Sequence, residues 1–289
     1  MSAKLLMIQG TSSGSGKSTL VTGLCRIFTN KGYRVAPFKA QNMSSKIFTI
    51  TGTSDKISLA QAIQAIASRK KPDVRMNPIL LKPLGDYRSR IIVSGKFYSE
   101  MYAKEYYERF ILQKGFPFIL RAIDSLRKEN DIIVIEGAGS PAEINILKYD
   151  VANMLLAEKV GAPVIITTDI ERGGCFASIV GTFKLLRPIH RNLVKGFLIN
   201  KFRGDRSLLD SAIKYVEKIT RKRSFGVLPK IDFNLPDEDS LDSNNNNNFN
   251  KSKLPQESWD WQIDLIAKAI RENINIRKIT TEVARLENK

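Results

Sequence analysis

The chain has 289 residues, of which 43% are hydrophobic, and a formal net charge of +17. This apolar content supports a sizeable core, and the length fits one large α/β domain or two small ones. No apolar run approaches the roughly 20 residues of a membrane span, and the first residues lack the apolar stretch of a secretory signal, so we expect a cytoplasmic protein without membrane contact.

The positive charge is concentrated in residues 181–230, which contain thirteen Lys or Arg and three Asp or Glu. A field of this kind attracts polyanions. Because the region has no zinc-finger spacing and no run of alternating basic and aromatic residues, a nucleotide with a polycarboxylate is favoured over nucleic acid as the ligand. A basic face that contacts only solvent is the remaining interpretation.

The first expected strand, residues 5–8, is followed by a Gly/Ser-rich turn at 10–16 and a helix that opens with Lys17. This order is the context of a phosphate-binding loop, although Gly10 lies one residue earlier than in the strict pattern. Glycine lets backbone N–H groups converge on an anion, and the helix N-terminus adds partial positive charge. We expect Lys17 to contact the β- and γ-phosphates of ATP and the Ser18 hydroxyl to ligate Mg²⁺. The predicted nucleotide-binding residues here are Gly10, Thr11, Gly14, Gly16, Lys17, Ser18 and Thr19.

The rest of the chain alternates predicted strands and helices. Further strands are expected at residues 34–37, 90–93, 131–136, 163–169, 194–200 and 224–228, and helices at 56–69 and, interrupted near Gly115 and Pro117, over much of 99–130. The alternation predicts an α/β fold with a doubly wound, mostly parallel sheet of about seven strands. Right-handed crossovers place the carboxyl ends of such strands at one edge, which collects Lys17, Lys39, Glu136, Asp169 and Asn200.

The composition changes after residue 229. An acidic cluster at 237–239 precedes an Asn-rich run, so we predict a P-loop domain over residues 1–242, a flexible linker over 243–258 and a C-terminal amphipathic helix with a tail over 259–289. In that helix Trp259, Ile263, Ile266 and Ile270 are spaced four, three and four residues apart and form one apolar face. We expect this face to dock on the domain or on a partner rather than on a membrane.

Five segments beyond the phosphate-binding loop carry a family resemblance: residues 35–44 (VAPFKAQNMS), 76–83 (MNPILLKP), 135–145 (IEGAGSPAEIN), 172–178 with its Arg-Gly-Gly, and 195–209, which includes INKFRGDRSLL. Together they resemble the N-terminal, ATP-dependent domain of the cobyric acid synthases. The resemblance implies a dethiobiotin-synthetase-like P-loop NTPase fold with ATP and Mg²⁺ as cofactors. It also implies a ligase of cobalamin biosynthesis that amidates peripheral carboxylates of a corrinoid through an acyl phosphate, from adenosylcobyrinic acid a,c-diamide to cobyric acid.

The resemblance also implies roles at the predicted sheet edge. Lys39 stands where it would bridge a phosphate and the substrate carboxylate, which makes it a catalytic residue beside Lys17. Ser18, Glu136 and Asp55 are the expected Mg²⁺ ligands, and Glu136 is favoured because it ends a buried strand. The remaining assignments are Asn200 for adenine and Gln41, Asn42, Ser44 and Asn145 for the corrinoid.

In the family a glutamine amidotransferase domain follows, whose chemistry needs a nucleophilic Cys beside a His. The chain has one histidine, His190, and two cysteines, Cys25 and Cys175, which are too few for a disulfide framework. Because Cys25 is expected inside the P-loop helix and His190 near the start of a strand, we expect no Cys–His pair. The expected nitrogen source is therefore free ammonia or a separate glutaminase subunit, and a homodimer is an alternative assembly.

Three departures from the family pattern bear on activity: Lys56 and Ile66 stand where glutamates are usual, and Arg90 where a glutamine is usual. Glu171, where an aspartate is usual, is a milder change. These departures leave open a second interpretation, a non-catalytic nucleotide- or corrinoid-binding paralogue, which the intact Lys17 opposes. A third interpretation is a partition-type P-loop ATPase. Such proteins carry a second lysine five residues before the catalytic one, where this chain has Ser12.

Overall fold

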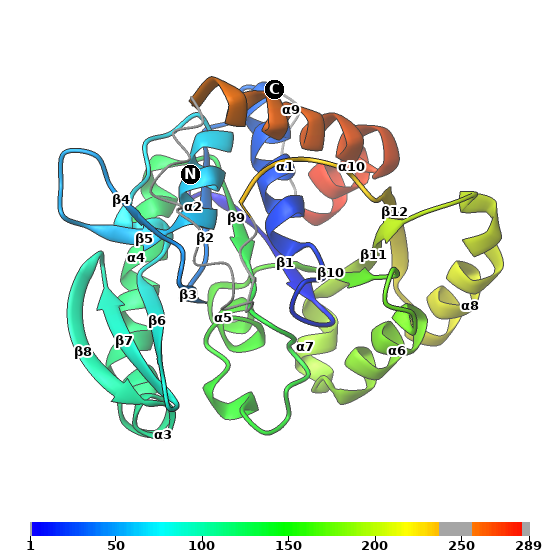
Figure 1. Ribbon diagram of the computed structural model, residues 1–289. Helices are drawn as coiled ribbons and strands as arrows, with labels where there is room; N and C mark the ends of the chain where they lie inside the picture. The colour runs from blue at the N-terminus through cyan, green and yellow to red at the C-terminus, as the bar shows by residue number, and fades with distance from the viewer. Residues whose placement is uncertain (1, 237–255, 285–289) are drawn as a thin grey trace.

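The computed structural model describes residues 2–236 and 256–284 (Figure 1). The central sheet contains β1 (Lys4–Gly10), β2 (Val35–Phe38), β9 (Ile132–Glu136), β10 (Val164–Asp169), β11 (Val194–Phe202) and β12 (Arg223–Pro229). The main helices are α1 (Lys17–Asn30), α2 (Leu59–Ala67), α4 (Phe116–Glu129), α5 (Met154–Val160), α6 (Cys175–Leu185), α7 (Pro188–Leu193), α8 (Asp210–Thr220) and α9 (Gln256–Asn273). The other strands are β3 (Gln41–Met43), β4 (Ile47–Thr49), β5 (Lys56–Ser58), β6 (Ile79–Gly85), β7 (Arg88–Val93) and β8 (Lys96–Tyr102). Short helical segments are α3 (Ala103–Glu105), α10 (Ile276–Lys278), η1 (Val74–Met76), η2 (Tyr106–Gly115), η3 (Leu147–Tyr149), η4 (Arg206–Leu209) and η6 (Ile279–Val283).

The six strands of the central sheet are parallel and lie in the order β12-β11-β10-β1-β9-β2. Helices α1 and α9 contribute to the core on one face of the sheet, and α4, α5, α6 and α8 to the core on the other (Figure 1). The predicted α/β fold with a doubly wound parallel sheet is therefore confirmed.

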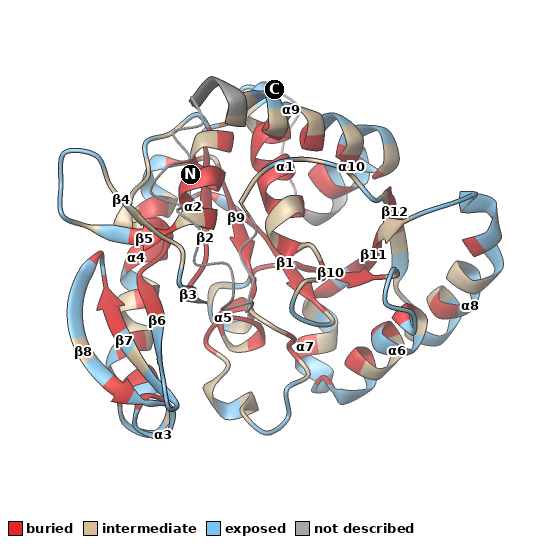
Figure 2. Cartoon of the chain, viewed as in Figure 1, coloured by how far each residue is buried: buried red, intermediate tan, exposed pale blue. Residues whose placement is uncertain are grey.

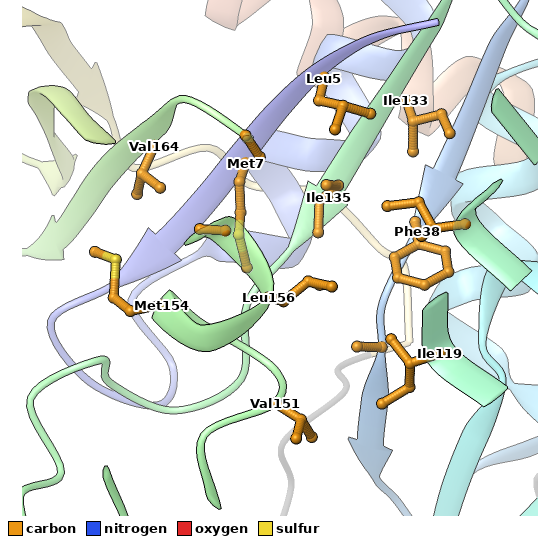
Figure 3. Packing of buried hydrophobic residues seen from close by; sticks show 14 of the residues in the cluster. Leu5, Met7, Phe38, Ile119, Ile133, Ile135, Val151, Met154, Leu156 and Val164 are labelled. Atoms are coloured by element: carbon orange, nitrogen blue, oxygen red, sulfur yellow. The ribbon is translucent and has the colours of Figure 1, made fainter. Parts of the chain in front are cut away.

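Strand β1 shows how both faces of the sheet are buried. Leu5 and Met7 belong to the core beneath α4 and α5, whereas Leu6 and Ile8 belong to the core beneath α1 and α9. Figure 3 shows Met7 among the side chains of this core, together with Met154 and Leu156 of α5. A strand with two buried faces has a continuous apolar sequence, which is why residues 5–8 were recognisable as a strand. Figure 2 shows the same contrast across the molecule, with buried central strands and a largely exposed β8.

Of the about seven predicted strands, six form the central sheet, and the remaining one, residues 90–93, belongs to a second sheet. Its order is β3-β6-β7-β8, with β3 parallel to β6 and the other pairs antiparallel. The turns between β6 and β7 (Asp86, Tyr87) and between β7 and β8 (Ser94, Gly95) all have positive φ. Two-residue turns of this kind form hairpins, whereas a parallel crossover needs a dozen or more residues.

The predicted helical stretch over 99–130 is also corrected at its start, since helical structure begins at Ala103 and residues 96–102 form the edge strand β8. The expected interruption near Gly115 is a change of helix type, from a π-helix that ends at Gly115 to α4, which starts at Phe116. Pro117 stands at this junction, in the first turn of α4.

The C-terminal helix packs on the domain itself, where α9 contacts α1 (Figure 1). Its apolar face is buried at Ile263, Ile266 and Ile270. Gly23 of α1 permits the close approach, because a Cβ there would overlap the side chain of Ile270. Of the linker predicted over 243–258, residues 243–255 lie outside the described residues and 256–258 belong to α9. Within residues 2–236 and 256–284, no helix combines the length and the apolar character needed to cross a bilayer.

Candidate active site

The chain leaves the neighbouring strands β1 and β9 toward opposite faces of the sheet. After β1 it enters α1, and after β9 it passes through residues 137–153 to α5 on the other face. Such a switch point is where open α/β sheets bind ligands. Lys17 connects its two sides, because Nζ donates to the carbonyl oxygens of Ser12 (2.9 Å) and Gly139 (3.1 Å). The predicted P-loop lysine thus lies at the switch point.

The phosphate-binding loop depends on glycine at three positions. A Cβ on Gly10 would overlap Ser15 Oγ, and Gly14 and Gly16 have φ angles of 70° and 88°. Helix α1 begins without a capping side chain and without an acid in its first turn, where Ser18 and Thr19 follow Lys17. Among the described residues, the buried Ser15 Oγ has no hydrogen-bond partner. These features suit a loop whose amides bind an anion such as phosphate.

Side chains from β10 and β11 hold this loop in place. Thr11 in the loop donates its hydroxyl to Thr168 Oγ1 of β10 (3.0 Å). Asn200 of β11 donates Nδ2 to the carbonyl oxygen of Ser15 (3.1 Å), and a Cβ on Gly16 would overlap that amide group. Asn200 therefore supports the loop, and its predicted role in adenine recognition stays a prediction.

Lys201 is a second support that the sequence analysis missed. Its Nζ donates to the carbonyl oxygen of Gly14 (2.7 Å) and pairs with Asp169 Oδ2 (2.9 Å). Its backbone has a positive φ of 60°, unusual for a residue other than glycine. The available signal was its position directly after Asn200 at the end of a predicted strand. Lys201 brings a further positive charge to the edge where an anion is expected.

Glu136 ends β9 and is fully buried. Its Oε1 accepts a hydrogen bond from Ser18 Oγ (2.8 Å) and pairs with Lys39 Nζ (2.8 Å), and its Oε2 accepts from Gln64 Nε2 (2.5 Å). A buried carboxylate needs partners of this kind to remain charged. The structure therefore brings Ser18, Lys39 and Glu136 together and adds Gln64, which the sequence analysis did not name.

The oxygen atoms at this point suit Mg²⁺. The Ser18 hydroxyl and the Glu136 carboxylate are hard ligands whose oxygens lie 2.8 Å apart. The described residues contain no group of three or more His, Cys, Asp or Glu that could enclose a metal ion. Because Mg²⁺ at nucleotide sites is usually held by one or two protein oxygens together with phosphate oxygens and water, this donor set fits the ion.

Among the residues that the structure describes, Asp55 and Asn145, two of the predicted site residues, form no hydrogen bond or ion pair with the cluster of Ser18, Lys39 and Glu136. Asp55 precedes β5, where a helix had been predicted, and lies against Gly95 of the second sheet. Within the described chain, its carboxylate makes no hydrogen bond or ion pair with Ser18 or Glu136. Asn145 is exposed in the segment 137–153. Their roles as metal ligand and corrinoid ligand stay predictions.

The predicted corrinoid residues that follow Lys39 lie on β3 and just after it. The hydroxyl of Tyr106 donates to Gln41 Oε1 (2.8 Å), and Asn42 donates Nδ2 to Gln61 Oε1 (3.1 Å). Asn42 and Ser44 are buried, and Gln41 is half-buried. These polar groups therefore lie on the side of the second sheet, and Asn42 is connected to Glu136 through Gln61 and Gln64.

The segment 137–153 on the other side of Lys17 is held by Asn153. Its Nδ2 donates to the carbonyl oxygen of Ala138 (2.6 Å), and its Oδ1 accepts from the N–H of Ala138 (3.2 Å). Nδ2 also donates to Asp150 Oδ1 (2.9 Å). Burial raises the pKa of Asp150 to about 7, against the opposing effect of the hydrogen bonds from Asn153 and backbone amides. A carboxyl group that titrates near neutrality is thus linked to the segment that contacts Lys17.

The cysteines and the histidine do not form a glutaminase-type pair in the part of the chain that the structure describes. Cys25 is buried in α1, which raises the pKa of its thiol to about 12. Burial also raises the pKa of Cys175 at the start of α6. His190 Nε2 lies 2.8 Å from Glu158 Oε2 of α5.

Comparisons with known proteins identify the family of the chain. The family of the CobQ/CobB/MinD/ParA nucleotide binding domain matches residues 6–240. The probable cobyric acid synthase of Thermococcus onnurineus is 53% identical over 243 residues, which cover 83% of this chain and 49% of that protein. The cobyric acid synthase of Dehalococcoides mccartyi strain 195 is 51% identical over 240 residues, with 83% and 47% coverage. That of Streptococcus sanguinis is 50% identical over 238 residues, with 82% and 47% coverage. The chain therefore spans about half the length of the curated relatives it matches.

Proposed function

The chain belongs to the CobQ/CobB/MinD/ParA nucleotide-binding family, and from that premise we propose that it is an ATP-dependent carbon–nitrogen ligase similar to cobyric acid synthase. Its substrate is a corrinoid polycarboxylate, adenosylcobyrinic acid a,c-diamide, whose peripheral carboxylates become amides in cobalamin biosynthesis. The observation that supports this most is the convergence of Lys17, Ser18, Lys39 and Glu136 at one switch point of the sheet.

The proposed reaction has two steps. A carboxylate reacts poorly with ammonia because oxide is a poor leaving group. Attack of a carboxylate oxygen on the γ-phosphorus of ATP releases ADP and gives an acyl phosphate. Ammonia then attacks the acyl carbon, phosphate leaves with one former carboxylate oxygen, and the amide remains after loss of a proton. Phosphoryl transfer of this kind is catalysed mostly by positioning and by neutralisation of charge.

The residues at the switch point match these demands. Lys17 is held between the loops that follow β1 and β9, where it would neutralise the β- and γ-phosphates. Lys39 is held on Glu136 and precedes the polar residues of β3, so its ammonium group is suited to hold the substrate carboxylate next to the phosphate. Ser18 and Glu136 would hold Mg²⁺, which when bound neutralises phosphate charge.

The three departures from the family pattern lie outside this cluster. Lys56 is exposed on β5, and Ile66 packs against the core beneath α1 and α9. Arg90 pairs with Glu100 on the second sheet (2.8 Å). Lys17 Nζ donates instead to the carbonyl oxygens of Ser12 and Gly139. This favours the enzyme over the non-catalytic paralogue.

The decisive experiment measures ATP hydrolysis by the purified chain with and without the corrinoid. Corrinoid-dependent release of ADP, together with amide formation, supports the ligase. An equal rate of ATP hydrolysis with and without the corrinoid would indicate a partition-type ATPase. Nucleotide binding without any hydrolysis would indicate the non-catalytic paralogue.

The nitrogen source is tested with ammonium or glutamine as the sole donor. Because no Cys–His pair is present among the described residues, we propose that this chain uses free ammonia or ammonia from a separate glutaminase subunit. Ammonium should support amidation, and glutamine should not unless such a subunit is added. Comparable turnover with glutamine alone would contradict this part of the proposal.

A further inference from the structure

A chain of buried side-chain amides leads away from Glu136 through α2. Gln64 Nε2 donates to Glu136 Oε2 (2.5 Å), and Gln61 Nε2 donates to Gln64 Oε1 (3.5 Å). Gln61 Oε1 in turn accepts from Asn42 Nδ2 (3.1 Å) and from the Ser58 hydroxyl. All five residues are buried, with relative exposures of 0–3%. This series of buried side-chain hydrogen bonds therefore connects the end of β9 to β3.

The donor and acceptor roles in this series of hydrogen bonds are set by the carboxylate of Glu136 at one end. An ionised carboxylate only accepts hydrogen bonds, so Gln64 must turn its NH₂ group toward Glu136 and its oxygen toward Gln61. Gln61 must then present its own NH₂ group, and its oxygen is left for the donors of Asn42 and Ser58. Each amide has one orientation in which its partners are satisfied. The series of hydrogen bonds therefore acts as a rigid support, because its donors and acceptors cannot be exchanged.

We propose that Gln64, oriented by Gln61, is a positioning residue that sets the rotation of the Glu136 carboxylate. Gln64 donates to Oε2 of Glu136, and this contact keeps the other oxygen, Oε1, directed at Ser18 and Lys39. This inference rests on the proposed function, in which Glu136 and Ser18 hold Mg²⁺ beside ATP. Gln64 would then raise the affinity for the metal without touching it.

The expected effect follows from the general behaviour of groups that orient metal ligands. Removing the hydrogen-bond partner of a ligand commonly lowers metal affinity by about 10- to 100-fold. Without Gln64 Nε2, Oε2 of Glu136 would lose a buried donor and the carboxylate could rotate. Nucleotide binding through the loop amides and Lys17 does not involve Gln64 and should persist without the metal.

The test uses Gln64→Met, which preserves length and removes the donor, and Ser68→Ala as the matched control. Ser68 lies just past the same helix, where its hydroxyl donates to the carbonyl oxygen of Gln64 (3.1 Å) rather than to Glu136. Binding of a fluorescent, non-hydrolysable ATP analogue is measured in EDTA and across a Mg²⁺ titration. We expect Gln64→Met to raise the Mg²⁺ midpoint about 10-fold or more, with affinity in EDTA unchanged within about two-fold. Ser68→Ala should change neither value.

Two further variants keep the outcome clear. Gln64→Asn retains an amide on a shorter side chain and should raise the midpoint in the same direction, which provides a test if Gln64→Met fails to fold. Glu136→Gln reports on the metal site itself. A raised midpoint in Glu136→Gln with an unchanged midpoint in a folded Gln64 variant would overturn the positioning role and leave the proposed function standing. An unchanged midpoint in both would contradict the metal site on which the inference rests.

Discussion

Helix α1 takes part in two ionic clusters that differ in how far they are buried. At its first turn, Ser18 contacts the pair of Lys39 and Glu136. Two turns later, Arg26 pairs with Asp260 and Asp264 of α9. The side chains of Lys39 and Glu136 are 5% and 0% exposed, whereas Arg26 is 2% exposed and its two acids are 48% and 54% exposed.

This difference in exposure indicates that the two clusters have different roles. In the first cluster both charges are removed from water, so each one depends on its partner and the arrangement is suited to neutralise a bound anion or metal. In the second, only the guanidinium is dehydrated, and the carbonyl oxygens of Ala67 (3.0 Å) and Ile66 (3.4 Å) also accept its hydrogen bonds. Water can stabilise the acids if the arginine is lost. The first cluster should therefore control activity, and the second should control stability.

The largest effect is expected for Lys17→Ala. Removal of this ammonium group should lower ATP-dependent turnover at least about 1000-fold, because transition-state charge on the phosphates loses its partner. The free energy of unfolding should fall by about 1–3 kcal/mol, because the carbonyl oxygens of Ser12 and Gly139 lose a charged donor. Steady-state kinetics and urea denaturation measure the two quantities. Substantial turnover in the folded variant would place the catalytic phosphate site elsewhere.

Arg26→Met tests the other cluster. We expect a loss of about 3 kcal/mol in the free energy of unfolding, because α9 loses its ionic contacts and two buried carbonyl oxygens lose a donor. Turnover at low temperature should remain within about two-fold of the parent. The matched control is Arg34→Met, which removes a surface pair with Asp131 and should destabilise the fold far less. Equal losses in the two variants would mean that burial of Arg26 has no special importance.

The metal requirement separates the predicted ligands within the first cluster. Glu136→Gln should raise the Mg²⁺ concentration for half-maximal ATP turnover about 10-fold or more, because the buried strand holds this carboxylate beside Ser18. Asp55→Asn should have a small effect, since Asp55 lies against Gly95 instead. The measurement is a Mg²⁺ titration at saturating ATP. A larger effect in Asp55→Asn would reverse this ranking.

Asp150 should make the free energy of unfolding depend on pH near neutrality. Its folded-state pKa of about 7 lies above that of an unfolded aspartate, so the folded chain binds more protons and stability falls as pH rises through this value. Between pH 6 and pH 8 the parent should lose about 1 kcal/mol relative to Asp150→Asn. Urea denaturation of both proteins across this range measures the difference. A difference that does not change with pH would show that Asp150 does not titrate there.

The smallest effect is expected at Cys25, which lies on α1 between the two clusters. Its raised pKa and full burial should make it inert to a thiol reagent at pH 8 in the folded protein, and the buried Cys175 should behave similarly. Both should react in guanidinium chloride. Selective labelling of Cys25 in Arg26→Met would show that α9 uncovers α1 when the second cluster is removed.

The sequence by itself determined the features that depend on neighbouring residues. The phosphate-binding loop was evident because glycine spacing and the apolar run before it are local requirements of the backbone. Glu136 was recognisable because an acid directly after buried strand residues must lie at the sheet edge. Lys39 was found in the same way, just past β2. Their common location follows from the parallel order of the strands.

Only the tertiary structure decided the contacts between distant segments. The strand at 90–93 entered a second sheet because two short turns form hairpins, and Asp55 remained with that sheet. Gln64 approaches Glu136, 72 residues later, and Arg26 approaches Asp260, 234 residues later. Local spacing carries no information about which buried polar groups will satisfy one another, because that depends on how whole helices and strands pack. The hydrogen-bond support of the Glu136 carboxylate and the attachment of α9 were therefore decided by the fold.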